Sequence, residues 1–501
     1  GAMSHRTLSL FPGLLLAAAA ALTAAEPWIP LFNGADLAGW KTFRDGAGYG
    51  VDPQQVFKVT SGQLHFLDIA DTTTEQKFGF LITDAGYANY RLHVEQQWGT
   101  KRYPPRATLK RDSGICYHIY RADRIWPSGP ECQIQEGDTG DMFRLWSDDR
   151  CTGTATVRYD NDIPLRYGIS QCIGDTIGPG GLMKALRTIP VWLEVLRDCE
   201  ELCPDAWVLN YTNPMSMLCL AAARASRMRV VGLCHSVQGS SRQLAEYAGV
   251  PYAELEWCCG GINHMSWFVH LAHRGQNLYP SLCRKVRESR ELWEKDPVRF
   301  DMMLHFGAFV TESSGHFSEY VPYYRKRREL IDRYCRPGYL GGESFYADNW
   351  PTWRRECDDW RRRVLAGQEE LRTERSPEYA SYIIHARETH TPYVIHGNVP
   401  NTGLIDNLPQ DGCVEVACLV DRHGIQPTHF GRLPSQLAAL CAANMHVFDL
   451  AVQAILERSR EKAIYALTLD PLTAAVCSPA EARALALELF EAEKDFIPAL
   501  T

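Results

Sequence analysis

Residues 206–215 (AWVLNYTNPM) and 229–235 (RVVGLCH) decide the fold of the second half of this 501-residue chain. Each stretch begins with a short apolar run, which is typical of a buried strand, and ends in polar side chains. Helical patterns occur before and after these runs, in residues 182–202 and 433–459. The alternation predicts an α/β fold with a long helical extension.

Polar side chains follow both strands: Asn210 and Asn213 the first, Cys234 and His235 the second. Open α/β sheets bind ligands at the carboxyl ends of their strands, so we expect these four residues in one site. Further along the chain, GGINHMSWF brings His264. The cysteine and histidines can form a metal site, a nucleophile with its base, or ordinary structure, and their spacing leaves all three open.

Composition excludes one class of partner. The chain is 45% hydrophobic and 22% charged, as in a globular protein of two or more domains. Its net charge is -8 and no long Lys/Arg cluster occurs, so we expect no nucleic-acid partner. There are 17 cysteines, an odd number, and only Cys116 and Cys132 precede residue 150. This usage indicates reduced thiols and an intracellular origin for the second half.

Residues 1–25, in contrast, predict export of the protein out of the cytoplasm. A Gly-Ala-Met start typical of a cloning remnant precedes His5 and Arg6, the apolar run 8–22 and the small residues of 23–25. These are the parts of a secretory signal peptide, which indicates an exported or periplasmic protein. The apolar run is too short for a membrane span, and we expect no later segment long enough to cross a bilayer.

Residues 26–150 have an all-β pattern. VFKVTSGQLHF (56–66) alternates around a Ser-Gly turn, and YRLHVEQQW (90–98), SGICYHIY (113–120) and ECQIQEGD (131–138) follow between turn residues. Short strands at this spacing predict a β-sandwich-like domain. The character changes abruptly near residue 150, so we expect a second domain over 151–501.

The second domain resembles glycoside hydrolase family 4, in the α-galactosidase branch that includes α-galacturonidases. The matching segments occur in order: DNDIPLRYGISQCIGDTIGPGG (160–181), CPDAWVLNYTNPM (203–215), VVGLCHSVQG (230–239), GINHMSWF (261–268), FVTESSGHFSEYVPYYRKR (309–327), IIHARETHTPYVIHGNVPNTGLIDNLP (383–409) and CVEVACLVDRHGIQP (413–427). Together they span almost all of residues 155–501.

The resemblance implies a hydrolase of α-galactosides or α-galacturonides that acts by oxidation, elimination and addition. NAD oxidises the sugar at C3, and a divalent metal, usually Mn²⁺, binds the C2 and C3 oxygens. A thiolate prefers softer metals, so ligand chemistry alone favours zinc, and manganese comes from the resemblance. It also implies a small carbohydrate substrate and a homo-oligomer.

The resemblance assigns residues to this site. Cys234 and His264 would hold the metal, whereas Asn213 and Asp175, with Asn210 beside them, would contact sugar hydroxyls. These assignments come from the family and not from the spacing of the residues.

The acid and the base also follow from the resemblance. His235 is the candidate acid for the leaving oxygen, and Tyr320 is the preferred C2 base, with His316 and Glu319 as alternatives. Tyr320 lies in an aromatic run that, without the resemblance, is typical of packing. The glycines of 178–181 (GPGG) fit either an anion-binding nest or a simple turn.

One part of the family pattern is missing. The family begins with a strand, a Gly-rich turn and a helix that bind the NAD pyrophosphate, and residues 26–155 contain no Gly-x-Gly-x-x-Gly or related turn after a strand. Against the family pattern we therefore expect an incomplete Rossmann-like sheet with an exposed edge, weak NAD binding and doubtful hydrolytic activity.

The β-rich segment carries a second resemblance. WIPLFNGADLAGWKTF (28–43), DSGICYHIY (112–120) and WPSGPECQIQEGDTGDMF (126–143) resemble the secreted 3-keto-disaccharide hydrolase family, a concanavalin-like sandwich. Its polar residues line a sugar groove or form a solvated face: Asp112, His118, Glu131, Gln133 and Glu136. Two alternatives to the glycosidase follow, a secreted sugar-binding or 3-keto-glycoside-cleaving sandwich and a chimera without a working site.

Overall fold

The computed structural model describes residues 30–86, 92, 94–105, 107–108, 113–116, 129–135, 138–145, 154–365, 368–369, 375 and 378–501. The chain divides into two compact units, Gly1–Trp146 and Ser147–Thr501. The predicted signal peptide lies outside the described residues.

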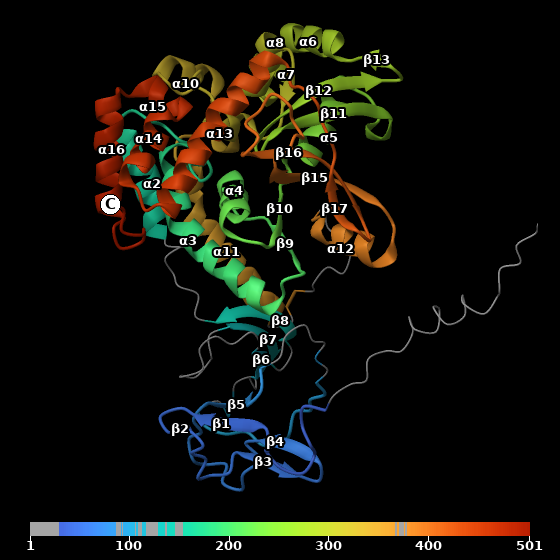
Figure 1. The fold of residues 1–501 in the computed structure, drawn as a ribbon, viewed down its shortest axis with the longest axis vertical. Coiled ribbons are helices and arrows are strands. Elements are labelled where there is room, and N and C mark those ends of the chain that lie inside the picture. Colours follow the sequence, from blue (N-terminus) through green and yellow to red (C-terminus); the bar gives the residue numbers. More distant parts are fainter. Residues whose placement is uncertain are drawn as a thin grey trace, which may run out of the picture. The chain divides into compact units, whose positions relative to one another are not determined.

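The first unit is built of strands alone in its described part (Figure 1). One antiparallel sheet has the order β2-β1-β5, β3 pairs with β4, and a third sheet has the order β6-β7-β8. The bounds are β1 (Trp40–Arg44), β2 (Gly48–Tyr49), β3 (Phe57–Thr60), β4 (Gln63–Phe66), β5 (Gly79–Thr83), β6 (Gly114–Cys116), β7 (Gly129–Gln135) and β8 (Asp138–Leu145). The all-β prediction is confirmed.

The turn between β3 and β4 is the predicted Ser-Gly turn. Ser61 and Gly62 both have positive φ, 52° and 75°, as a two-residue hairpin turn of the I′ type requires. Of the residues predicted to line a sugar groove, Asp112, His118 and Glu136 lie outside the described residues, so the groove stays a prediction.

The second unit contains a mixed nine-stranded sheet. Its main path is β13-β12-β11-β16-β15-β10-β9, with β14 paired to β12 and β17 to β16. Among the described strand pairs of this sheet, β9 and β10 are parallel and the others are antiparallel. The bounds are β9 (Trp207–Asn210), β10 (Arg229–Leu233), β11 (Leu255–Ile262), β12 (Met265–His273), β13 (Gln276–Asn277), β14 (Phe309–Val310), β15 (Tyr393–Pro400), β16 (Cys413–Asp421) and β17 (Gly424–Pro427).

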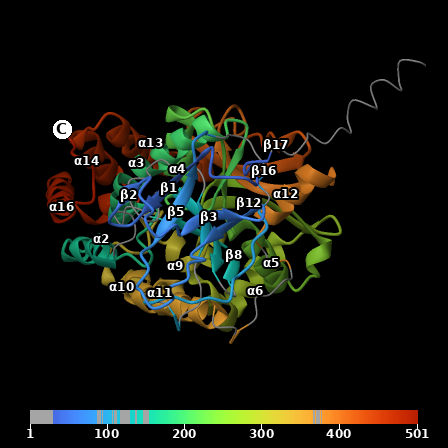
Figure 2. The ribbon, with the colours of Figure 1, turned by 90° about the horizontal axis from the view of Figure 1, so that it is seen from below.

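Helices cover this sheet and extend beyond it. Within the unit, Figures 1 and 2 both place α14 and α16 on the side opposite to α12 and β17. Helices α4 and α13 contact the sheet and each other. The bounds are α2 (Thr154–Arg166), α3 (Gly178–Leu202), α4 (Met215–Ala225), α5 (Ser236–Ala248), η2 (Tyr252–Glu254), α6 (Tyr279–Glu288), α7 (Arg290–Lys295), α8 (Pro297–Phe306), α9 (Ser314–Phe317), α10 (Arg328–Tyr334), η3 (Gly338–Leu340), α11 (Phe345–Leu365), α12 (Ala380–Thr389), α13, α14 (Arg460–Leu469), α15 (Pro471–Val476) and α16 (Pro479–Ala492).

Helix α13 (Ser435–Leu456) corrects one expectation. With 22 residues it is long and apolar enough to cross a bilayer, which we did not expect of any segment after the N-terminus. Half of its most apolar stretch is buried, and Leu437, Cys441 and Phe448 belong to the main hydrophobic core. Its contacts with α3, α4 and α14 are those of a core helix.

The sheet ends at β9 within the described part of the chain. Strand β9 pairs with β10 on one side and with no described strand on the other. The described residues that precede α2 form antiparallel hairpins and contain no strand, Gly-rich turn and helix in succession. An unpaired edge of this kind leaves backbone N–H and C=O groups free to pair.

The glycines at the start of α3 serve close packing. A Cβ built on Gly180 would lie 2.1 Å from the Gly174 carbonyl oxygen, and one on Gly181 would lie 2.4 Å from the Thr176 carbonyl carbon. The glycines of the GPGG segment therefore allow helix α3 to pack closely against the loop that precedes it.

A buried ion cluster joins α2, α3 and the end of α16. The Arg187 guanidinium donates two hydrogen bonds to Asp160, with N–O distances of 3.1 and 2.6 Å, and contacts the Glu493 carboxylate as well. All three side chains are almost fully buried. Burial and the nearby Asp160 carboxylate together raise the pKa of Glu493 to about 9, against the opposing charge of Arg187. The cluster therefore places one cation between two carboxyl groups whose charged forms burial disfavours.

Candidate active site

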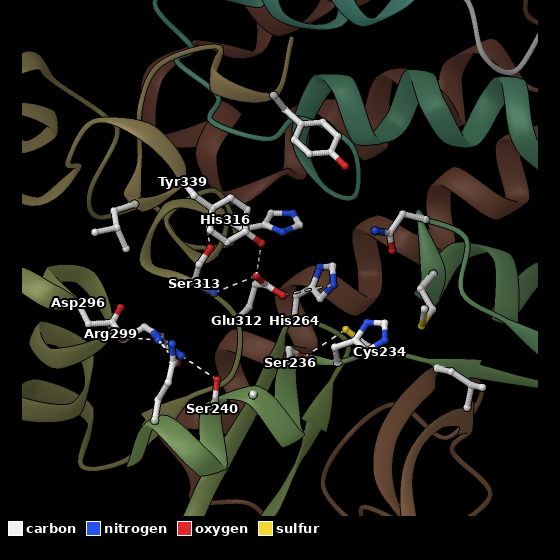
Figure 3. A pocket seen from close by; sticks show the side chains of 18 of the residues that line it. Cys234, Ser236, Ser240, His264, Asp296, Arg299, Glu312, Ser313, His316 and Tyr339 are labelled. Atoms are coloured by element: carbon white, nitrogen blue, oxygen red, sulfur yellow. Dashed lines mark hydrogen bonds and ion pairs between the residues drawn. The ribbon is translucent and has the colours of Figure 1, made fainter. Parts of the chain in front are cut away.

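A cavity of about 720 Å³ opens at the carboxyl ends of β9 and β10, where the sequence predicted a site. Residues from both strand ends line it, together with side chains from the β11–β12 turn, the segment after β14, and α7 and α8 (Figure 3). Cys234, His264 and Glu312 meet at one end of the cavity, and Asp296 and Arg299 form another part of its wall.

Cys234, His264 and Glu312 are grouped as metal ligands would be. One candidate ligand atom from each residue lies within 4.8 Å of the other two. The His264 Nε2 atom lies 3.6 Å from a Glu312 carboxylate oxygen. A thiolate, an imidazole and a carboxylate are each common ligands of divalent metals.

The backbone at two of these positions is strained. His264 occupies the tight turn between β11 and β12 with φ of 64°, and Glu312 has φ of 69° just after β14. A residue other than glycine in this left-handed region costs about 1–2 kcal/mol. Such strain concentrates at functional sites, where the surrounding structure holds it.

Tyr320 lies behind His264. Its hydroxyl is 3.1 Å from His264 Nδ1, and its side chain is fully buried and does not line the cavity. Burial raises the pKa of Tyr320 well above its usual range. If the proton of the neutral imidazole is on Nδ1, the Tyr320 oxygen accepts it and the Nε2 lone pair is left for a metal.

The charges around the cluster favour a cation. Burial opposes the charge on His264, but the Cys234 sulfur and the Glu312 carboxylate raise its pKa to about 10. Burial also opposes the charge on Glu312, but the charges of His264 and His316 outweigh burial and lower the pKa of Glu312 to about 2. Cys234 and Glu312 therefore stabilise a positive charge between them, which is the His264 imidazolium when no metal is bound.

Arg299 forms the cationic part of the wall. Its guanidinium donates to Ser240 Oγ at 2.8 Å and to Gln243 Oε1 at 2.7 Å, and it forms an ion pair with Asp296. The arginine and the aspartate are both buried. The charge of Arg299 is therefore balanced inside the protein.

The structure brings together some of the predicted site residues and not others. Cys234, His235, Asn213 and His264 line the cavity. Tyr320, Asp175 and Asn210 do not: Asp175 pairs with Lys184 at 3.0 Å and lies 3.7 Å from His316 Nε2. Asn210 is used in a local turn, because its Oδ1 accepts from the Thr212 N–H at 2.9 Å.

Sequence reasoning missed several residues of the cavity: Glu312, Glu378, Arg299 and Tyr339. The Tyr339 hydroxyl donates to Glu312 Oε1 at 2.9 Å (Figure 3). The segment TESS around Glu312 was one possible signal, since it lies in a quoted stretch of the family resemblance.

Comparison with known proteins identifies the family. Residues 152–250 match the family 4 glycosyl hydrolases, residues 259–473 match their C-terminal domain, and residues 27–166 match a 3-keto-alpha-glucoside-1,2-lyase-like domain. An alpha-galactosidase of Bacillus subtilis (strain 168) is 42% identical over 343 residues, which are 68% of this chain and 78% of the relative. An alpha-galacturonidase of Lachnoclostridium phytofermentans is 29% identical over 366 residues, 68% of this chain and 77% of the relative.

Solved structures share the fold of the second unit. The Bacillus subtilis protein lplD has a TM-score of 0.61 at 26% identity and covers 67% of this chain and 80% of its own. A 6-phospho-alpha-glucosidase from gut microorganisms, solved with NAD and Mn²⁺, has a TM-score of 0.58 at 23% identity and covers 70% and 81%. With the two family matches in sequence order, the chain belongs to glycoside hydrolase family 4 in its second unit and is a glycosidase.

Proposed function

We propose that this glycosidase hydrolyses α-galactosides in the 720 Å³ cavity, with a divalent metal held by Cys234, His264 and Glu312. The observation that carries the proposal is the convergence of these three side chains within 4.8 Å at the carboxyl end of the parallel strands. The 42% identity to an alpha-galactosidase supports the choice of substrate.

The residues present fit a metal well. A thiol, an imidazole nitrogen and a carboxylate leave further coordination positions open for substrate oxygens, as catalytic metal sites do. When bound, the metal would act as a Lewis acid on sugar oxygens. We propose Mn²⁺ because the solved 6-phospho-alpha-glucosidase contains it. The thiolate in this donor set also suits Zn²⁺, which is the alternative metal.

Other cavity residues would bind and protonate the sugar. The Oδ1 of Asn213 and the Nε2 of His316 are buried and have no hydrogen-bond partner in the described structure, and both residues line the cavity. Sugar hydroxyl groups would satisfy both atoms. His235, exposed in the cavity, would supply the proton for the leaving oxygen.

The C2 base assigned to Tyr320 stays a prediction. Its buried hydroxyl on His264 supports a role in orienting the metal-binding imidazole. Tyr339 lines the cavity, but its hydroxyl donates to Glu312, and burial with this carboxylate raises the pKa of Tyr339, so the phenol holds its proton.

NAD is the second cofactor that we propose, because the solved 6-phospho-alpha-glucosidase contains it. The described residues before α2 do not fit its pyrophosphate, since they contain no strand followed by a Gly-rich turn and a helix.

The 42% identity to an alpha-galactosidase favours a neutral galactoside over a galacturonide. The carboxylate of a uronate would require a cation; the charge of Arg299 is paired with Asp296, and Lys295 is the further cation in the lining of the cavity. The match of residues 27–166 to a 3-keto-alpha-glucoside-1,2-lyase-like domain favours a second candidate, cleavage of 3-keto glycosides by the first unit.

Assays of the full chain test these functions. We expect cleavage of 4-nitrophenyl α-galactoside that depends on NAD, Mn²⁺ and reductant together, and slower cleavage of the galacturonide. Titration with NAD at millimolar levels is the sharpest measurement. Without a saturable signal the redox route fails, and cofactor-free cleavage of a 3-keto glycoside would favour the second candidate.

Replacing Tyr320 with phenylalanine is expected to weaken Mn²⁺ binding by about 10–100-fold, the usual cost of losing a hydrogen-bond partner of a metal-binding histidine. Isothermal titration calorimetry measures the affinity. Tyr324→Phe is the matched control, because Tyr324 is also buried and its hydroxyl donates to Asp301, 3.0 Å away. Equal affinities in the two variants would contradict the role of Tyr320.

A further inference from the structure

His235 is held by an aromatic ring and a carboxylate that the family resemblance did not assign. Its ring stacks on Tyr211, with centroids 5.4 Å apart and planes 13° apart. Its Nε2 lies 2.9 Å from the Glu378 Oε2 atom. All three residues line the cavity.

The chain around Glu378 is anchored to the site itself. The hydroxyl of Tyr379 donates to the Cys234 carbonyl oxygen at 3.0 Å. The backbone N–H of Ala380, the first residue of α12, donates to the Tyr211 hydroxyl at 3.1 Å. Glu378 therefore precedes two residues that are fixed to the ends of β10 and β9.

The contact with Glu378 decides which nitrogen of His235 carries the proton. An ionised carboxylate only accepts hydrogen bonds, so Nε2 must be the donor. In the neutral His235 ring, this contact places the single proton on Nε2. In the imidazolium, Glu378 holds the Nε2 proton, so the proton on Nδ1 is the one that can be transferred.

The side chains of His235 and Glu378 are 53% and 59% exposed. An exposed ion pair on an outer surface contributes little to stability. This pair faces the cavity, where a bound sugar would remove water from it and strengthen the interaction. We therefore expect the His235–Glu378 pair to affect the rate of the reaction, although it adds little to the free energy of unfolding.

We propose that Glu378 is a positioning residue that holds His235 as the proton donor to the departing sugar or alcohol, an inference that rests on the proposed α-galactosidase function. In the step concerned, the bond between C1 and the glycosidic oxygen breaks with its electron pair on that oxygen, and the Nδ1 proton of the imidazolium moves to this oxygen. The water that then adds forms the new bond to C1 through its oxygen and returns one proton to the neutral ring.

The leaving group tests this role, because a nitrophenolate departs without a proton and an alkyl alcohol does not. We expect Glu378→Gln to lower kcat for methyl α-galactoside by about 10²-fold, the lower end of the range for general acids. For 4-nitrophenyl α-galactoside we expect a change within about threefold, because the acid is not needed there. An equal loss on both substrates overturns the proposal.

Glu254→Gln is the matched control. Glu254 also accepts from a histidine, His273, at 2.9 Å and does not line the cavity, so its replacement should leave both rates unchanged.

A readout without catalysis separates this inference from the proposed function. In the full chain with ¹⁵N-labelled histidine at alkaline pH, we expect the His235 ring to carry its proton on Nε2, and Glu378→Gln to populate both tautomers. A His235→Gln spectrum assigns the signals. Unchanged ring signals in Glu378→Gln overturn the inference, whereas an inactive wild type overturns the α-galactosidase function and leaves the ring signals to decide the role of Glu378.

Discussion

Replacing Cys234 with alanine is expected to remove measurable Mn²⁺ binding and to lower α-galactosidase turnover by about 10³-fold. The thiol is one of three side chains that meet within 4.8 Å. Without it, His264 and Glu312 are left 3.6 Å apart with opposite charges and can satisfy each other as an ion pair. A metal typically supplies several kcal/mol of transition-state stabilisation, and about 4 kcal/mol corresponds to the expected factor.

Calorimetric titration with Mn²⁺ and with Zn²⁺ measures this loss, and the thermal midpoint of the variant shows whether the fold is kept. Cys258→Ala is the matched control, because Cys258 is an exposed cysteine on β11, the strand that leads to His264. The control should bind both metals as the wild type does. Wild-type affinity in Cys234→Ala would show that the cluster is not the metal site.

Three of the four predicted residues that line the cavity share a local origin. Asn213, Cys234 and His235 follow strands that are parallel neighbours, so their proximity follows from the strand pattern alone. Parallel strands place their carboxyl ends at one edge of a sheet, and a sequence shows where such strands end. The helices α3 and α13 were predictable for a similar reason, since the period of their apolar residues is local.

Glu312 and Glu378 could not be predicted in this way, because their positions depend on contacts between distant segments. Glu312 reaches the site because β14 pairs with β12, which places Val310 opposite Trp267. Glu378 reaches it through contacts of the next two residues with the ends of β9 and β10. The strand order of the sheet also depends on contacts between distant segments. Strand β15 lies antiparallel between β10 and β16, and its local sequence does not indicate that position.

Tyr320 shows the limit of residue type as a guide. It belongs to a run with Tyr323 and Tyr324, and any of these hydroxyls had the chemistry of a base. Only the tertiary packing shows that Tyr320 is fully buried on His264. Tyr339, whose hydroxyl does reach the cavity wall, lies in a separate short helix.

Replacing Arg187 with methionine is expected to destabilise the second unit by about 3–5 kcal/mol near neutral pH, the usual cost of removing one partner of a buried ion pair. The variant leaves Asp160 and Glu493 buried without a cation. Both carboxyl groups must then stay protonated in the folded state, because burial already raises the pKa of each one in the wild type.

The defect should depend on pH with a definite sign. Folding raises the pKa of such a carboxyl group above its value of about 4 in the unfolded chain. The group therefore stabilises the folded state fully at pH values below about 4, and this stabilisation is lost as the pH rises through the pKa in the folded state. In Arg187→Met two such groups act together, so the loss of stability should be smaller at about pH 5 than at about pH 8, with a slope of up to about 1.4 kcal/mol per pH unit for each proton.

Urea unfolding of the wild type and the variant at both pH values measures this difference. Arg197→Met is the matched control, because Arg197 is exposed on the same helix α3 and its replacement should change the free energy of unfolding by less than about 0.5 kcal/mol. A defect in Arg187→Met that does not change with pH would contradict the account of the cluster. In that case the methionine would be destabilising through altered packing between α2, α3 and α16, and not through two carboxyl groups left without their cation.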